Sequence, residues 1–312
     1  MEPFIEASLQ RELLAIKLPT LPAVAIQLIG LGQSEHANAQ QLATVVGQDP
    51  ALATNLLRLS NSAAYRRARQ ADTVFLAVSY LGFEPARMFA LSAALVPALA
   101  AGGGPGFCYT AYWRRALLSA ACARVVGRHL LAADAEAVAL AALLQDIGML
   151  ALAQLQGPFY ATLECDGYVH GNALSYERER LSTDHAAVGG WLLDRWGLPE
   201  RLALAVRTSN APDLCMADSA GVDFNRLVMA AGLLADIWTW SGPPSDLAAH
   251  QADVCRLLGC DWPALVEMLD EASDEIPMVE AMCGMQVVDA AHLQLALQVL
   301  SERLPSTADG AV

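Results

Sequence analysis

The sequence predicts an all-α protein, and three observations support this class. Ala and Leu dominate a chain of 312 residues that is 55% hydrophobic and 17% charged, as in helical proteins with much buried surface. Helix-start signals recur, for example Asp49 followed by Pro50. No stretch alternates apolar and polar residues between turn signals, as a half-buried strand would.

Start and stop signals divide the first hundred residues into short helices. After Asp49 a stripe of leucines ends near Asn61, which is the pattern of one helical face. Pro22 precedes an apolar run that glycine ends, and the segment LGFEP interrupts a longer helical pattern. The predicted helices cover 23 to 30 or 32, about 38–46, about 50–60, and two within 72–96 that are separated at 81–85.

The second half of the chain continues the helical pattern after a glycine-rich break. Three consecutive glycines in AAGGGPGF, residues 100–107, do not sustain a helix. The frayed end PSTADGAV follows the last helical stripe. The predicted helices cover about 109–131, 134–155, 182–206 and parts of 247–305, and the predicted loops are 207–223 and 239–246.

Charge and hydropathy patterning exclude two classes of partner. A net charge of −14 and a pI near 4.7 argue against nucleic acid, because phosphate binding needs a clustered basic face. The longest uncharged run begins at Met88 but contains Pro97, Pro105 and four glycines, which suits a helix ending in a loop better than a membrane span. We expect neither a nucleic-acid nor a membrane partner.

Cysteine usage and the N-terminus indicate the cytoplasm. The seven cysteines form no C-x-x-C motif, and their odd number favours free thiols in a reducing compartment. Glu2 and Glu6 stand where a secretory signal would carry Lys or Arg ahead of an apolar core. We expect a cytoplasmic protein without disulfides.

Six motifs in order resemble the HDOD family, a branch of the HD-domain superfamily. The motifs are LPTLPAVAIQLIGL, VVGQDPALATNLLRLSNSAAY, AVSYLGFEPARMFAL, YWRRALLSA, ALLQDIGML and DHAAVGGWLLDRWGLPERLALAV. The resemblance implies a multi-helical HD/HDOD-like fold used in bacterial signal transduction, with extra C-terminal helices. It divides the chain into an HDOD-like domain at 1–240, made of subdomains at about 1–104 and 105–240, and a helical extension at 241–312.

The same resemblance identifies the positions of a metal site. Hydrolases of the HD superfamily hold a divalent metal with a His, an adjacent His-Asp pair and a later Asp. Here the first His position is Arg115, the pair is Gln145-Asp146, and the later Asp falls near Gly232. His185 matches an additional His of some catalytic relatives. Of the main ligand set, only Asp146 is retained.

These departures predict that the chain is not an enzyme and holds no cofactor. A metal that activates water needs several imidazole or carboxylate ligands. Arg115 is permanently protonated and repels a cation. On its helix it shares a face with apolar residues, so we hypothesise that Arg115 pairs with Asp146 in place of the metal. The alternatives are a solvated Arg115, a structural Asp146 held by hydrogen bonds, and a His185 that caps a helix or packs in the core.

A short basic cluster is the candidate partner contact. Arg66, Arg67 and Arg69 lie in a predicted loop on an otherwise acidic molecule, where they could meet an acidic protein surface or a phosphate. The alternative is a solvated loop without a partner.

The predicted function is therefore a non-catalytic regulatory module that binds another regulatory protein. One alternative is a metal-dependent phosphohydrolase. Another is a small-ligand sensor that uses the vestigial pocket around Asp146 and His185.

Overall fold

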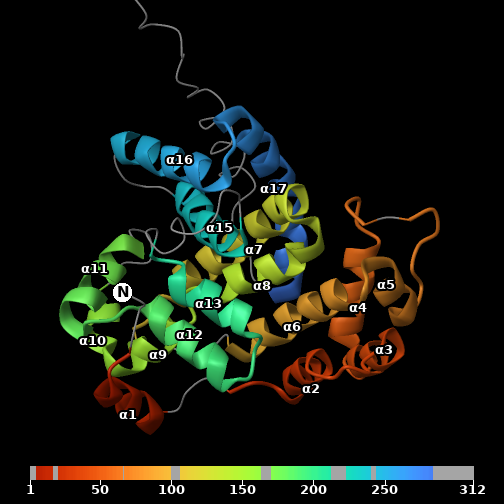
Figure 1. The fold of residues 1–312 in the computed structure, drawn as a ribbon, viewed down its shortest axis with the longest axis horizontal. Coiled ribbons are helices and arrows are strands. Elements are labelled where there is room, and N and C mark those ends of the chain that lie inside the picture. The colour runs from red at the N-terminus through yellow and green to blue at the C-terminus, as the bar shows by residue number, and fades with distance from the viewer. Residues whose placement is uncertain are drawn as a thin grey trace, which may run out of the picture.

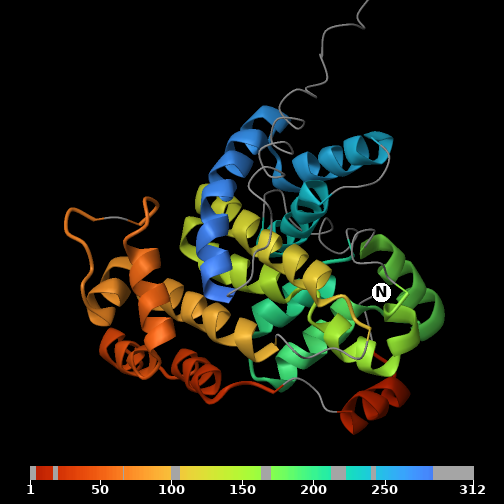
Figure 2. The ribbon, with the colours of Figure 1, turned by 180° about the vertical axis from the view of Figure 1, so that it is seen from behind.

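The computed structural model describes residues 5–16, 20–65, 67–99, 106–162, 170–211, 223–239 and 244–283. Throughout these ranges the elements are helices, which confirms the predicted all-α class. Figures 1 and 2 show three groups of helices around the central pair formed by α7 and α8. Helices α2 to α5 lie on one side of this pair, α10 and α11 lie on the opposite side, and α16 and α17 lie at a third.

The N-terminal helices agree closely with the predicted ones. Asn38 and Gln41 form a reciprocal capping box at the start of α3, and the Asp49 side chain accepts hydrogen bonds from Ala51 N and Leu52 N at the start of α4. Gly82, with φ at +93°, separates α5 from α6 where the break was predicted. The helices are α2 (Ala23–Gly32), α3 (Ala39–Gly47), α4 (Pro50–Ser60), α5 (Val74–Leu81) and α6 (Phe83–Leu99).

One N-terminal helix was not predicted. Helix α1 (Ala7–Ala15) buries Leu9 and Leu13 and packs against α9 (Gly148–Leu155). This contact joins the start of the chain to the second half of the predicted domain. The sequence signal was weak because α1 has no side-chain cap and no strong stop residue.

The prediction of one helix over 134–155 is wrong. The chain forms a short 3₁₀ turn (Ala132–Asp134), α8 (Ala135–Leu144) and then α9, with Gln145, Asp146 and Ile147 in the turn between the two helices. The apolar periodicity continues through this turn because both helices are buried, so hydrophobicity gave no sign of the break.

The remaining helices surround this turn. Helix α7 packs against α8, α15 and α17, and α16 packs against α15. Helices α10 and α11 were not predicted, and α16 begins inside the predicted loop 239–246. The bounds are α7 (Tyr109–Leu130), α10 (Gly157–Tyr160), α11 (His170–Leu181), α12 (His185–Arg195), α13 (Glu200–Thr208), α15 (Phe224–Trp238), α16 (Pro244–Leu258) and α17 (Trp262–Cys283).

Buried ion pairs attach α17 to the core. Arg124 of α7 contacts Glu136 of α8 at 2.9 Å and Glu275 of α17 at 3.8 Å. Arg128 contacts Glu275 at 2.8 Å. The Tyr65 hydroxyl donates to Glu136 at 2.8 Å, so the loop after α4 joins the same network. The C-terminal helices are therefore packed on the core.

Among the described residues, the helical segment Ala132–Leu155 is long and apolar enough to cross a membrane, and α5 with α6 passes the same test only if this pair, bent by 118°, is taken as one span. The most apolar window of Ala132–Leu155 is 89% buried within the protein. Its hydrophobic residues therefore already have protein neighbours, as in the core helices of globular proteins.

The expectation of a protein without disulfides is wrong. Cys108 takes part in a disulfide, whereas Cys122, Cys255 and Cys260 are free thiols. Pairing depends on the separation of Cα atoms in the fold, which the spacing of cysteines in a sequence does not reveal.

Candidate functional site

The turn between α8 and α9 places Gln145 and Asp146 at the centre of the molecule. Both residues are 2% exposed. Gln145 Nε2 donates to the carbonyl of Ala142 at 3.1 Å, and the carbonyl of Asp146 accepts from Met149 N at 2.9 Å. These bonds satisfy local backbone groups and leave the Asp146 carboxylate directed at other helices.

Arg115 lies buried between two carboxylates. Its Nη1 contacts Asp146 Oδ2, its Nε contacts Asp236 Oδ1 at 2.7 Å, and its Nη2 donates to Asp236 Oδ2 at 3.1 Å. The Arg115–Asp146 pair proposed from the sequence is present, and the solvated alternative does not hold. The two bonds to Asp236 form the bidentate arrangement that fixes a guanidinium most firmly.

Asp236 was missed in the sequence, where the later acidic position was assigned near Gly232. Gly232 lies one helical turn earlier on α15. A Cβ there would lie 2.7 Å from Gln145 Oε1 and 3.0 Å from Arg115 Nη2. Position 232 therefore has no room for a side chain beside Gln145 and Arg115, and the carboxylate comes from Asp236.

A second cluster lies on the other side of Asp146. His185 Nε2 faces His170 Nε2 at 2.8 Å, and the two nitrogens lie 3.5 and 3.4 Å from Asp146 Oδ1. His185 is fully buried in the first turn of α12, and the residue that caps this helix is Asp184. His185 is thus a core residue and not the helix cap.

Glu177 holds the His185 ring in place. Glu177 Oε2 lies 2.7 Å from His185 Nδ1 and accepts from His185 N at 2.8 Å, and the Tyr160 hydroxyl donates to Glu177 Oε1. Asn210 Nδ2 lies 2.9 Å from His185 Nε2. Both ring nitrogens of His185 therefore have fixed partners.

Charge and burial oppose each other in these clusters. Burial alone would raise the pKa of Asp146, but Arg115 holds it well below its usual range. Burial is the main cause that lowers the pKa of His170, and the nearby positive charge of Arg115 lowers it further. Burial would also lower the pKa of His185, but the Glu177 carboxylate and hydrogen bonds to Asp146 and Glu177 raise it to about 10. The site therefore favours positive charge at His185.

A cavity of about 320 Å³ adjoins both clusters. Helix α16, beyond the predicted HDOD-like domain, supplies one of its walls. The residues around it come from four helices and two turns and combine charged and apolar side chains. They include Arg115, Gln145, His170, Leu174, Ser209, Asn210, Met229, Leu233, Asp236, His250, Asp253, Arg256 and Leu257.

The residues do not fit the metal site that the resemblance implies. The Arg115 guanidinium contacts Asp146 directly, at the position of the first ligand. Gln145 uses its amide nitrogen on a backbone carbonyl, and Gly232 offers no ligand atom. A cation placed among these three positions would meet a fixed positive charge.

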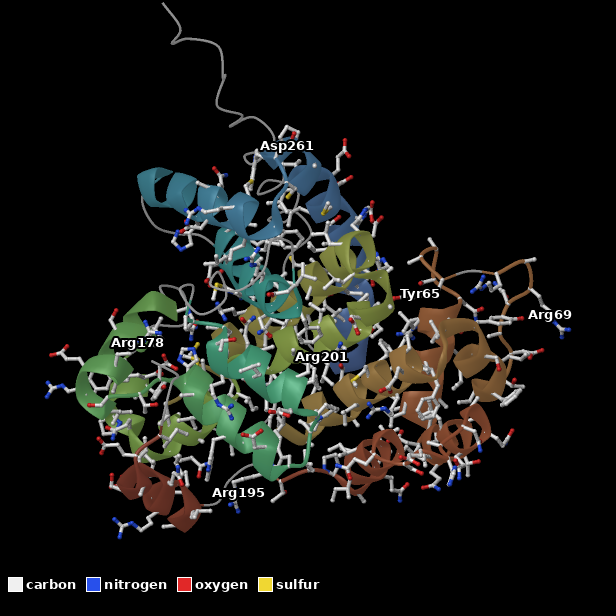
Figure 3. The ribbon with its side chains drawn as sticks, viewed as in Figure 1. Tyr65, Arg69, Arg178, Arg195, Arg201 and Asp261 are labelled. Carbon is white, nitrogen blue, oxygen red and sulfur yellow. The ribbon has the colours of Figure 1, made fainter. Side chains whose placement is uncertain are left out.

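The basic cluster lies far from this site in the structure. Figure 3 shows Arg69 at the outer edge of the molecule, with its side chain pointing away from the ribbon. Arg67 is also exposed, Arg69 forms an exposed ion pair with Asp72 at 3.4 Å, and Arg66 lies outside the described residues. Asn61 closes this loop, because its side chain exchanges two hydrogen bonds with the backbone of Ala71.

Four site residues were missed in the sequence: His170, Glu177, Asn210 and Asp236. His170 and Glu177 are seven residues apart, which places them on one face of α11. A search for titratable residues at this spacing would have found them. Asn210 follows α13 in a segment predicted as a loop, and it carried no distinguishing signal.

Comparison with protein-family models finds a match to the HDOD domain over residues 18–212, more than half of the chain. No curated protein matches the chain.

Solved structures share the fold. An HDOD domain protein of unknown function from Geobacter sulfurreducens aligns with a TM-score of 0.66 at 22% identity, over 88% of this chain and 97% of that one. A protein from Shewanella amazonensis, provisionally named a phosphohydrolase, aligns with a TM-score of 0.64 at 21% identity, over 90% and 98%. A provisionally named signal transduction protein from Marinobacter aquaeolei aligns with a TM-score of 0.57 at 25% identity, over 92% and 63%.

Proposed function

Because the chain belongs to the HDOD domain family, we propose that it is a bacterial signal-transduction module that acts by binding a regulatory protein and catalyses no reaction. The similarity to a protein named for signal transduction in Marinobacter aquaeolei supports the first part of this proposal. The proposal includes a cytoplasmic location, with which the free thiols of Cys122, Cys255 and Cys260 agree and the Cys108 disulfide does not.

One observation carries the non-catalytic part. The Arg115 guanidinium bridges Asp146 and Asp236, so two carboxylates that could ligate a hydrolytic metal neutralise an arginine instead. A hydrolase of this class needs ligands that together lower the pKa of a bound water to about 7. A fixed positive charge at that point opposes both metal binding and that ionisation.

We therefore expect no phosphoester hydrolysis above the buffer rate. The protein would be preincubated with Mn²⁺, Fe²⁺ or Zn²⁺ and assayed with p-nitrophenyl phosphate and bis-p-nitrophenyl phosphate, with an active hydrolase as positive control. Asp146→Asn is the matched control, because a contaminating activity would be the same in both proteins. A rate that Asp146→Asn abolishes would contradict the proposal and establish the phosphohydrolase alternative.

We expect the Arg67 and Arg69 loop to contact an acidic surface of the partner. Exposed arginines on a protein of net charge −14 give a local positive potential that favours such a contact. Arg67→Glu with Arg69→Glu should reduce recovery of a cross-linked partner at least tenfold in quantitative mass spectrometry. Arg11→Glu with Arg195→Glu changes the net charge equally at exposed sites elsewhere. If the partner is recovered equally with the Arg67/Arg69 double variant and with the Arg11/Arg195 double variant, this surface is ruled out.

The cavity favours a second candidate, the small-ligand sensor. Its volume of about 320 Å³ is in the range of small-molecule sites, and it combines apolar walls with charged groups. A ligand bound there would contact both α16 and the core. Because it would bind the folded protein and not the unfolded chain, it would raise the melting temperature.

A further inference from the structure

Two free thiols lie at the turn between α16 and α17. Cys255 lies in the last turn of α16, and Cys260 directly precedes Asp261, whose side chain caps α17. Both cysteines are half-buried, and neither takes part in a disulfide. Figure 3 shows Asp261 at the outer edge of the molecule, so small molecules in solution can reach this turn.

The backbone of the turn holds the two cysteines together. Gly259 has φ at +64°, and Cys260 N donates to the carbonyl of Cys255 at 3.3 Å. A left-handed glycine with this bond forms the Schellman motif, in which the side chains of the two bonded residues frequently contact each other. Burial raises the pKa of the Cys255 thiol to about 11, and the neighbouring Cys260 thiol adds to this rise.

A second turn of the same kind has a purely apolar contact. Gly197 has φ at +71°, and Leu198 N donates to the carbonyl of Leu193 at 3.1 Å. Both leucines are buried, so the contact there only excludes water. Cysteines in the equivalent positions also serve as small apolar residues, but they can in addition form a covalent bond with each other.

The separation of the two cysteines suits such a bond. Two residues joined by a backbone hydrogen bond have Cα atoms about 5–6 Å apart, and a disulfide needs about 4.4–6.8 Å. The hydrogen bond from Cys260 N has already closed the turn, so a disulfide would cost little further chain entropy.

We propose that Cys255 and Cys260 are a modification site, at which a low-molecular-weight disulfide such as glutathione disulfide oxidises both thiols to an intramolecular disulfide. One cysteine thiolate attacks a sulfur of the oxidant, forms a mixed disulfide and releases one glutathione. The second cysteine thiolate then attacks the protein sulfur of the mixed disulfide and releases the other glutathione. The protein loses two electrons and two protons, and one glutathione disulfide becomes two thiols.

The modification would occur beside the cavity. Asp253, Arg256 and Leu257, which flank Cys255 on α16, all line it. A bond to Cys260 would fix the end of this wall to the start of α17. The inference goes beyond the proposed regulatory function, because it concerns a chemical change in the module and not the binding of a partner.

The test uses the full-length protein, treated with a thiol reductant under native conditions, desalted, and incubated with glutathione disulfide at about pH 8, where more of each thiol is ionised. Remaining thiols are alkylated. Cleavage before Asp253 and Asp261 and after Arg256 leaves the two cysteines on separate short peptides, so mass spectrometry detects their disulfide as a linked pair. In the wild type this linked pair should exceed the glutathione adducts of the two peptides at least tenfold.

Single serine variants separate the two steps of the reaction. In Cys255→Ser and in Cys260→Ser the remaining cysteine should stay bound to glutathione, because no second thiol displaces it. Cys122, a fully buried free thiol, is the internal control and should take up no glutathione.

The rate should increase with pH. Burial and the nearby Asp261 carboxylate raise the pKa of the Cys260 thiol as well. Since only the thiolate attacks a disulfide, each pH unit between about 7 and 9 should speed formation of the linked pair about tenfold.

Two results would overturn the site. One is a wild type that retains glutathione on Cys255 or Cys260 as fully as the serine variants do, which would mean that the thiols do not meet. The other is the absence of any reaction at both cysteines. Circular dichroism checks that the reduced protein and the variants are folded, and alanine replaces serine in any variant that is unfolded. Hydrolysis and partner recovery are measured without the oxidant, so failure of this site leaves the proposed function unaffected.

Discussion

Replacing Arg115 by alanine is expected to lower the free energy of unfolding by about 3–5 kcal/mol, because it leaves a buried carboxylate without its counter-charge. The Arg115 side chain is 6% exposed, and its partners Asp146 and Asp236 are 2% and 19% exposed. Urea unfolding followed by circular dichroism measures the change. The loss should appear as a lower midpoint with an unchanged slope.

Two controls separate the ion pair from simple loss of packing. Arg114→Ala removes the adjacent, half-buried arginine and should cost about 1 kcal/mol or less. Arg115→Met combined with Asp146→Asn and Asp236→Asn removes all the charges while keeping most of the volume, and should recover much of the stability. If Arg115→Ala unfolds at the wild-type midpoint, the guanidinium does not hold these helices together.

Replacing Gly148 by alanine is expected to cost about 3 kcal/mol, the upper part of the range for overpacking. A Cβ at this position would lie 2.0 Å from the carbonyl oxygen of His185 and 2.8 Å from Gly189 N. Both are backbone atoms, which unlike a flexible side chain cannot turn away. Helices α9 and α12 would have to separate, so the variant should also displace His185 from Asp146.

Gly30→Ala is the matched control for the Gly148 variant. Gly30 lies within α2, and a Cβ there would have no atom within 4 Å. Alanine is the better helix former, so this variant should gain about 0.5–1 kcal/mol. Thermal unfolding of both variants beside the wild type tests the pair. A stable Gly148→Ala protein would show that the two helices are not in close contact.

The sequence predicted most of the helices and one of the two carboxylates that contact Arg115. Arg115 was recognised because it shares a helical face with apolar residues, and a charge in that position needs a buried partner. Asp146 was the predicted partner because it is the one acidic residue of the main ligand set that this sequence retains. Asp236 was not recognised because it lies one turn beyond the position that the family pattern indicated, and both positions fit the apolar run around them.

The second cluster depends on contacts that a single sequence does not contain. His170 and His185 meet because the segment between them turns α11 back on α12. Asp184 marks the start of α12 in the sequence, but it does not indicate which side chains the turn brings together. Likewise, the contact at Gly148 is made with a residue of another helix. Periodicity reports which face of a helix is apolar, but it does not report which helix covers that face.

The placement of Asp236 bears on where this chain can be divided. The family model ends at residue 212, whereas the second carboxylate on Arg115 comes from α15 and a cavity wall comes from α16. A fragment cut at the family boundaries would lose half of the counter-charge of its central arginine and would open the interior to water. The smallest unit expected to fold on its own therefore extends through α17, well past the segment that defines the family.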